Sequence, residues 1–218
     1  MYIITTIFSG IISSMTYKTH LSTGMLFSAT AFLLLMPSRC EISGEHCLLI
    51  TPVLILTLVL STWLGASAPD LDTPTGELWH KIPAGSFIGR LIQPAFLGGH
   101  RHLSHSILGL AIFTFLFYLL AKVVFGFYPS LDMHNAILAF VIGYSSHLFA
   151  DSLTEAGVPI LFPIGYHFGI PPDPFGKVRI KTGKWFENLL LYPLVNILLV
   201  YVIYQSVKIY PQIFVDLF

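Results

Sequence analysis

Five apolar stretches run along the chain, separated by polar segments: 21–37, 47–68, 106–128, 135–150 and 189–207. A helix rises about 1.5 Å per residue, so it needs about 20 apolar residues to cross a hydrocarbon core of roughly 30 Å. The second, third and fifth stretches are long enough by themselves, and the first and fourth become so when flanking polar residues are included. The pattern therefore predicts an all-α protein, a polytopic transmembrane helical bundle of about five spans.

The composition also indicates a membrane protein whose main partner is the lipid bilayer. Only 10% of the residues are charged, against roughly 25% in a soluble domain, and 55% are hydrophobic. So few charges cannot cover the surface of a water-soluble protein of this size. The 11 basic and 11 acidic residues balance, which removes the electrostatic argument for nucleic acid as a partner.

A single membrane-embedded domain, residues 16–207, accounts for these stretches. The run 1–15 is too short to span and lacks the basic start of a signal peptide, so either Met15 is the true start or this run adds an interfacial helix. Eight Lys and Arg residues fall on the side of the N-terminus and the two long loops, and three fall on the other side, which predicts a cytoplasmic N-terminus. Cys40 and Cys47 lie on the opposite side, where they either pair or remain thiols.

The first polar cluster, Pro69-Asp70-Leu71-Asp72-Thr73-Pro74, directly follows the second apolar stretch. The prolines favour an extended segment, in which residues two apart point the same way. We therefore expect Asp70 and Asp72 to present paired carboxylates to one cation. The alternative is an ordinary turn that ends the helix.

The second cluster, Gly98-Gly99-His100-Arg101-His102-Leu103-Ser104-His105-Ser106, precedes the third stretch. A glycine-loosened loop lets His100 and His105 turn inward, with Ser104 as the expected helix N-cap. The helix N-terminus and Arg101 suit an anionic group such as phosphate. The alternative is a set of interfacial histidines without a role.

The third cluster ends the fourth stretch, where His147 and Asp151 are four residues apart and so share one helix face. They can ligate one metal, or form a structural hydrogen bond. His20, just before the first stretch, joins them because the five-span topology brings all the candidate ligands to one membrane face. These predicted ligands are His20, Asp70, Asp72, His100, His105, His147 and Asp151.

Imidazoles and carboxylates without thiolates favour a divalent metal, with zinc first and manganese second. Seven candidates exceed what one ion needs, so a site with more than one ion is expected. Two neighbouring metals activate water and hold a phosphoryl group. We expect Arg101 to hold developing negative charge and Asp151 to act as a catalytic residue as well as a ligand.

The ordered set of motifs resembles the YdjM-like family of bacterial and archaeal inner-membrane proteins, described as metal-dependent hydrolases. The family is distantly similar to zinc-dependent phospholipase C and related single-strand nucleases. The resemblance implies hydrolysis of a phosphate ester, and His102 departs from the small residue that the family carries there. The motifs are His20, Pro69-Asp70-Leu71-Asp72, Gly99-His100-Arg101, Ser104-His105-Ser106, Gly143-Tyr144, His147, Asp151, Gly157-Val158-Pro159, and Arg179-Ile180-Lys181-Thr182-Gly183 with Glu187.

Two further segments are expected at the membrane surface. Residues 87–97 carry apolar side chains at helical spacing, which predicts an interfacial helix. The proline-rich segment 157–176 cannot form a regular helix and is interpreted either as a re-entrant or interfacial lid, or as an aromatic membrane anchor.

The sequence therefore predicts a membrane-bound metal-dependent hydrolase acting on a phosphate ester, from a lipid or another amphiphile. One alternative is a cation transporter or metal-binding protein, although transporters place their ligands nearer the bilayer midplane. Another is a lipid phosphatase resembling the type-2 phosphatidic acid phosphatases, whose pattern has an Arg five residues before the histidine. Here that position is Ile142.

Overall fold

The structure is a computed structural model that describes residues 16–43, 52–73, 79, 83–95, 101–127 and 132–209. Within these ranges every regular element is helical, and the only extended pairings are two isolated bridges, Thr154–Ile180 and Val158–Phe168. This confirms the all-α prediction. Residues 1–15, His100, Cys47 and the Cys40 side chain lie outside this description. The longer helices are α2 (Tyr17–Ser43), α3 (Pro52–Ser67), α5 (Gly85–Ile92), α6 (Ile107–Phe127), α7 (Met133–Ser152) and α8 (Tyr192–Ile209).

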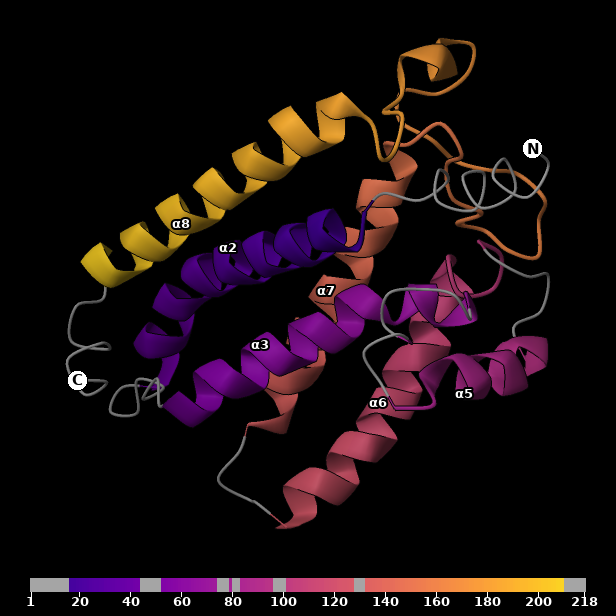
Figure 1. The fold of residues 1–218 in the computed structure, drawn as a ribbon. Coiled ribbons are helices and arrows are strands. Elements are labelled where there is room, and N and C mark those ends of the chain that lie inside the picture. The colour runs from indigo at the N-terminus through magenta and orange to yellow at the C-terminus, as the bar shows by residue number, and fades with distance from the viewer. Residues whose placement is uncertain are drawn as a thin grey trace.

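Helix α7 is the central helix and packs against α2, α3 and α6, while α8 packs along α2 (Figure 1). Two glycines let α3 and α7 approach closely. A Cβ on Gly65 would lie 2.1 Å from the Phe140 carbonyl oxygen, and one on Gly143 would lie 2.4 Å from that of Thr62. Because α7 is enclosed in this way, its polar residues can be buried inside the bundle.

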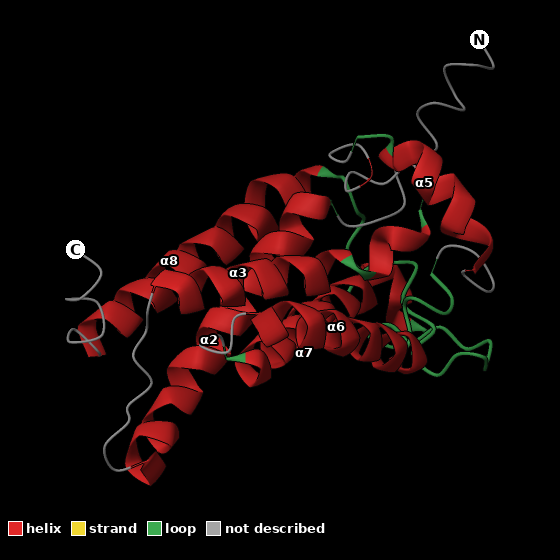
Figure 2. Ribbon diagram, turned by 90° about the horizontal axis from the view of Figure 1, so that it is seen from below, coloured by secondary structure: helices red, strands yellow, loops and turns green. Residues whose placement is uncertain are grey.

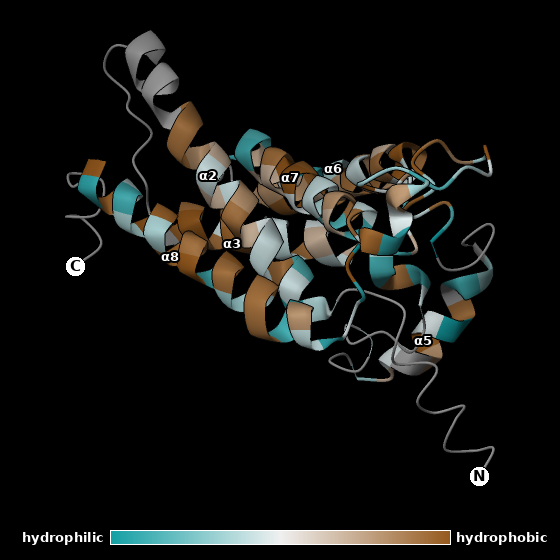
Figure 3. Ribbon diagram, turned by 90° about the horizontal axis from the view of Figure 1, so that it is seen from above, coloured by the Kyte–Doolittle hydropathy of each residue, from teal (hydrophilic) through white to brown (hydrophobic). Residues whose placement is uncertain are grey.

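Helices α6 and α8 instead turn apolar side chains outward. The α6 and Glu187–Ile209 segments are hydrophobic and long enough to span a bilayer, yet only 17% and 6% of their residues are buried. Hydrophobic residues prevail along both helices in Figure 3. Such large exposed apolar surfaces require a non-aqueous surrounding. Within the described chain only these two meet both span criteria, and α3 is shorter, so the five-span arrangement stays a prediction.

The helix ends differ from the predictions at two points. Asp132 caps α7 by accepting a hydrogen bond from the Asn135 amide at 3.0 Å. Helix α6, however, is capped by Ser106, which accepts from the Gly109 amide at 3.0 Å, so the prediction of Ser104 as the cap is wrong. After α3 the chain forms the 3-10 helix η1 (Pro69–Asp72) and is not extended, because Pro69 begins a new tight turn.

Most of the described loops gather at one end of the bundle, together with α5 (Figure 2). The segment 157–176 contains turns and no α-helix, although the 3-10 helix η3 (Phe175–Val178) begins at its end, and the segment is fastened to the ends of two helices. The Ile107 amide donates to the Ile160 carbonyl at 3.0 Å, and the Ile170 amide donates to that of Ser152 at 2.7 Å. In α5, Phe87 and Leu91 are each 70% exposed, as expected for an amphipathic helix.

Candidate metal centre

The last two turns of α7 provide the first two donors of the site. The His147 Nδ1 lies 2.7 Å from the Ala66 carbonyl oxygen. A carbonyl only accepts hydrogen bonds, so Nδ1 carries the proton and Nε2 presents a lone pair. That Nε2 is 3.7 Å from the Asp151 Oδ2 one turn later, as the spacing predicted. A backbone carbonyl that fixes the tautomer in this way is typical of metal-ligating histidines.

Two further donors complete a compact group. The His105 Nε2 lies 3.4 Å from the Asp151 Oδ2 and 3.9 Å from the Asp70 Oδ1. The Asp70 Oδ1 is in turn 3.7 Å from the His147 Nε2. Zinc bonds of about 2.0–2.1 Å in a tetrahedron hold nitrogen and oxygen ligands about 3.4 Å apart. We call Asp70, His105, His147 and Asp151 the four-donor site, because its spacing is close to what one such ion needs.

Burial supports a cation at the four-donor site. The side chains of His147 and Asp151 are fully buried, and their Nε2 and Oδ2 atoms have no hydrogen-bond partner among the described residues. A buried polar atom left without a partner costs about 1–3 kcal/mol, and more when it is charged. A bound metal ion satisfies both atoms at once.

Asp72 lies outside the four-donor site and contacts it through His105. One of its oxygens, Oδ2, accepts from the Ser104 hydroxyl at 2.6 Å and from the Arg101 amide at 3.1 Å, and it lies 3.5 Å from the His105 Nδ1. It thus faces the far side of the imidazole, where a carboxylate orients a ligating histidine. The expectation that Asp70 and Asp72 point the same way is wrong, because the 3-10 turn rotates successive side chains by about 120°.

The charge environment of His105 follows from these contacts. Burial alone lowers the pKa of its imidazole, but the neighbouring carboxylates of Asp151 and Asp72 raise the pKa from 6.5 to about 9. Without a metal, His105 is therefore protonated at neutral pH. A cation at the four-donor site has to displace that proton.

Arg101 is held against the site by an unusual backbone conformation. Its φ of 58° lies in the left-handed region, which a residue with a side chain rarely adopts. The conformation directs its amide to Asp72 and its guanidinium to Asp151, with Nη2 3.0 Å from Oδ1. The Arg101 Nη1 also donates a hydrogen bond to the Thr154 hydroxyl oxygen at 3.3 Å. The start of α6 is not an open anion site, because Ser106 and Ile160 already accept from its first amides.

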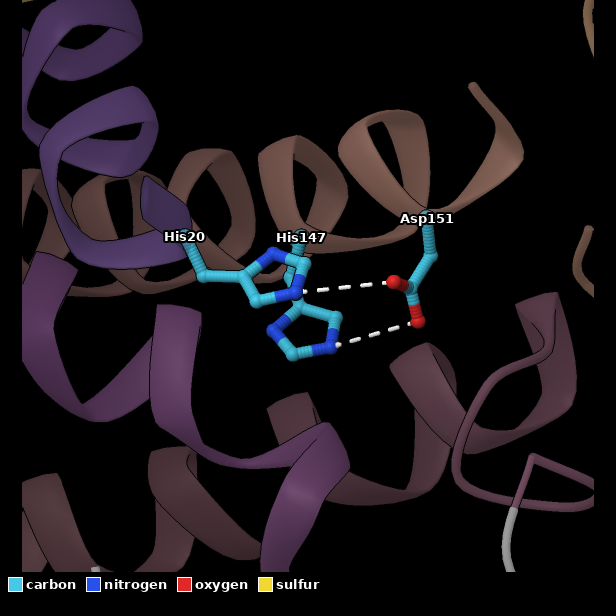
Figure 4. Close-up of side chains that lie close together, drawn as sticks. All are labelled: His20, His147 and Asp151. Atoms are coloured by element: carbon cyan, nitrogen blue, oxygen red, sulfur yellow. Dashed lines mark ion pairs between the residues drawn. The ribbon is translucent and has the colours of Figure 1, made fainter. Parts of the chain in front are cut away.

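His20 approaches Asp151 from α2, on the other side of His147. The two imidazoles stack with centroids 3.8 Å apart and planes 10° apart. Figure 4 shows that each ring points to a different oxygen of the same carboxylate. The His20 Nε2 lies 3.5 Å from the Asp151 Oδ1, the oxygen that Arg101 also contacts.

Seven of the predicted site residues meet in this cluster, and three of them, His20, Asp72 and Arg101, contribute from outside the four-donor site. His100 lies outside the described residues, and His102 contacts the rings of Phe162 and His167 instead. Arg179 is buried against the Pro171 carbonyl, away from the cluster. Sequence reasoning missed Thr154, whose position three residues after Asp151 was the available signal. The seven are His20, Asp70, Asp72, Arg101, His105, His147 and Asp151.

Comparison with known proteins identifies the family of the chain. A family model described as "YdjM inner membrane protein" matches residues 15–210. The chain belongs to the YdjM inner membrane protein family. It is 36% identical to "Inner membrane protein YdjM" of Escherichia coli (strain K12) and of Shigella flexneri, over 142 residues that make up 63% of this chain and 67% of the relative.

A more distant relative is "Uncharacterized protein YvsG" of Bacillus subtilis (strain 168). It is 27% identical over 128 residues, 59% of this chain and 67% of that protein. No solved structure gives a significant match. The YdjM names identify membrane proteins, which agrees with the exposed apolar faces of α6 and α8.

Proposed function

We propose that this YdjM-family protein is a membrane-bound metal-dependent hydrolase that cleaves a phosphate ester. The observation that carries the proposal is the four-donor site, in which the buried His105, His147 and Asp151 and the partly buried Asp70 lie beside the Arg101 guanidinium. Nitrogen and oxygen donors at this spacing suit zinc, and manganese second. A divalent ion bound there supplies a Lewis acid and acidifies a coordinated water.

The side chains around the ion have separate roles. Asp70, His105, His147 and Asp151 hold the cation, while Asp72 fixes the orientation of His105. Arg101 is positioned to bind the anionic oxygens of a phosphate group, because its guanidinium carries donors in a planar fork. Asp151 contacts both the cation position and Arg101, so it sets the substrate relative to the metal.

The substrate class follows from where the site lies in the bundle. In the five-span arrangement with a cytoplasmic N-terminus, the site lies at the cytoplasmic edge of the membrane. The neighbouring segment 157–176 exposes large apolar side chains, which favours contact with lipid. An amphiphile with a phosphate-ester headgroup is therefore the expected substrate. The exposed residues are Leu161, Ile164, Tyr166, Phe168, Ile170 and Phe175.

The test is elemental analysis and a phosphodiesterase assay on protein purified in detergent. The wild type is expected to contain zinc or manganese and to hydrolyse bis(p-nitrophenyl) phosphate or a phospholipid, with loss of activity on chelation and recovery when metal is restored. His147→Ala removes a ligand and is expected to lose metal and turnover. His134→Ala, an exposed histidine at the other end of α7, is the matched control and keeps both.

Two results would overturn the proposal. Metal that binds without hydrolysis of any phosphate ester would favour a transporter or metal-binding protein. Hydrolysis that survives complete metal removal would instead favour a metal-free phosphatase.

A further inference from the structure

We infer that the centre holds one divalent cation, and that Arg101 and His20 occupy the position of a second ion and bind an anionic, phosphate-type oxygen. The inference deepens the proposed function and rests on the same four-donor site. It departs from the expectation of more than one ion. It concerns ion count and anion binding, so it can be tested without any assay of hydrolysis.

Ring geometry separates the two histidines that lie beside His147. An imidazole ligates through a lone pair in the plane of its ring, so two imidazoles on one ion must point toward a common centre. His20 and His147 are stacked and nearly parallel, at 10°, so their lone pairs do not converge. His105 and His147 lie 66° apart with centroids at 5.3 Å, which permits convergence. His147 therefore shares an ion with His105 and not with His20.

The carboxylate of Asp151 divides the cluster into two parts. Its Oδ2 belongs to the four-donor site, and its Oδ1 faces the Arg101 Nη2 at 3.0 Å and the His20 Nε2 at 3.5 Å. A second ion placed there would have only His20 and one shared carboxylate oxygen as ligands. Such an ion would also lie next to the positively charged Arg101 guanidinium or push it aside, and the two positive charges would repel each other.

The charges of the surrounding side chains also favour a single divalent ion. The carboxylates of Asp70, Asp72 and Asp151 contribute three negative charges, and Arg101 contributes one positive charge. Before any anionic ligand binds, one divalent cation brings this total to zero, whereas a second would leave two uncompensated positive charges. A buried excess of this size is strongly unfavourable in a region of low dielectric.

Nitrogen atoms without hydrogen-bond partners lie beside the four-donor site, and they indicate which kind of ligand binds there. Both ring nitrogens of His20 and the Arg101 Nε are buried and have no hydrogen-bond partner within the described part of the chain. His20 is 1% exposed and Arg101 is 6% exposed. The Arg101 Nε–H and the one N–H of a neutral His20 fit an anionic oxygen of a ligand, because a phosphate oxygen accepts strongly from such groups.

The first experiment counts ions per chain by elemental analysis and native mass spectrometry after zinc loading and removal of excess zinc. We expect one ion in the wild type, one in His20→Ala and none in His147→Ala, with His134→Ala as the control at one. Two ions in the wild type, or loss of an ion in His20→Ala, would overturn the inference. The wild-type count alone decides if a variant does not fold. Absence of ions from every sample would overturn the proposed function as well.

The second experiment titrates the zinc-loaded protein with inorganic phosphate and with a short-chain phosphatidic acid. We expect at least a tenfold loss of affinity in Arg101→Gln and in His20→Ala while each keeps one ion. Binding of both probes assigns the site to phosphate oxygens in general, and binding of the lipid alone assigns it to a headgroup that needs its chain. Unchanged affinity in both variants, or binding of neither probe to the wild type, would overturn the anion-binding part.

Discussion

Helices α6 and α7 are neighbours of almost equal length, but they make opposite use of their surfaces. The side chains of α6 are apolar and mostly exposed, and it meets the length and hydropathy of a membrane span. Helix α7 buries His147, Asp151 and Tyr144 inside the bundle, together with Asn135, Ser146 and Ser152. Its lower hydropathy therefore follows from the polar side chains on its inward face.

Glycine substitutions in α6 and α7 are expected to give the largest difference in stability between the two helices. Gly143→Ala places a Cβ 2.4 Å from the Thr62 carbonyl oxygen, which backbone atoms cannot easily relieve. We expect a loss of about 3 kcal/mol in unfolding free energy, the upper end for overpacking. Gly126→Ala on α6 meets nothing within 4 Å and is expected to be neutral or slightly stabilising.

Thermal unfolding of both variants in the same detergent measures the difference. Equal melting temperatures would contradict the close packing of α3 against α7, on which the site depends.

A second test compares a buried with an exposed carboxylate. Glu187 is fully buried and accepts hydrogen bonds from the Thr16 amide, the Thr16 hydroxyl and the Gly183 amide at 2.7–2.8 Å. These bonds fasten the start of α2, which carries His20, to the segment before α8. Glu187→Gln removes the charge and places a side-chain NH2, which donates hydrogen bonds, opposite a backbone amide that also donates. We therefore expect the free energy of unfolding to fall by about 2 kcal/mol.

The matched control is Glu155→Gln, whose carboxylate forms only an exposed pair with Lys181 at 3.6 Å. We expect this substitution to change the free energy of unfolding by no more than about 0.5 kcal/mol. A Glu187→Gln variant as stable as this control would show that the Thr16 contacts do not hold α2 in place.

The pH dependence of metal binding tests the charge environment of His105. Its pKa is raised to about 9 in the metal-free protein, so the proton competes with the metal below that pH and no longer does so above it. We expect zinc affinity to rise about tenfold per pH unit up to about pH 9 and then to level off. Calorimetry in buffers of different ionisation enthalpy measures the released proton, and an affinity flat between pH 6 and 8 would contradict the arrangement.

The smallest expected effect concerns a single hydroxyl. Tyr144 is buried on α7 and donates its hydroxyl to the Ser104 carbonyl, next to His105. Tyr144→Phe leaves that carbonyl unsatisfied, so we expect a loss of about 1 kcal/mol in unfolding free energy. Tyr118→Phe on α6 is the control and should change it by less than half as much. Equal effects would mean that the bond does not support the loop.

The sequence predicts the donors of the site better than their arrangement. The spacing of His147 and Asp151 fixes their shared helix face, and the Asp132 cap marks where α7 begins. Asp70 and Asp72 were expected to point the same way, because two prolines disfavour a continued α-helix but do not distinguish an extended segment from a 3-10 turn. The stacking of His20 on His147 depends on how α2 packs against α7, which local spacing does not contain.

X-ray absorption spectroscopy of the zinc-loaded protein tests the central claim most directly, since it reports the ligands of the ion itself. We expect four nitrogen and oxygen neighbours at about 2.0–2.1 Å, with the multiple-scattering signal of two imidazoles. A sulfur neighbour at about 2.3 Å, or zinc surrounded by water without imidazole scattering, would contradict it.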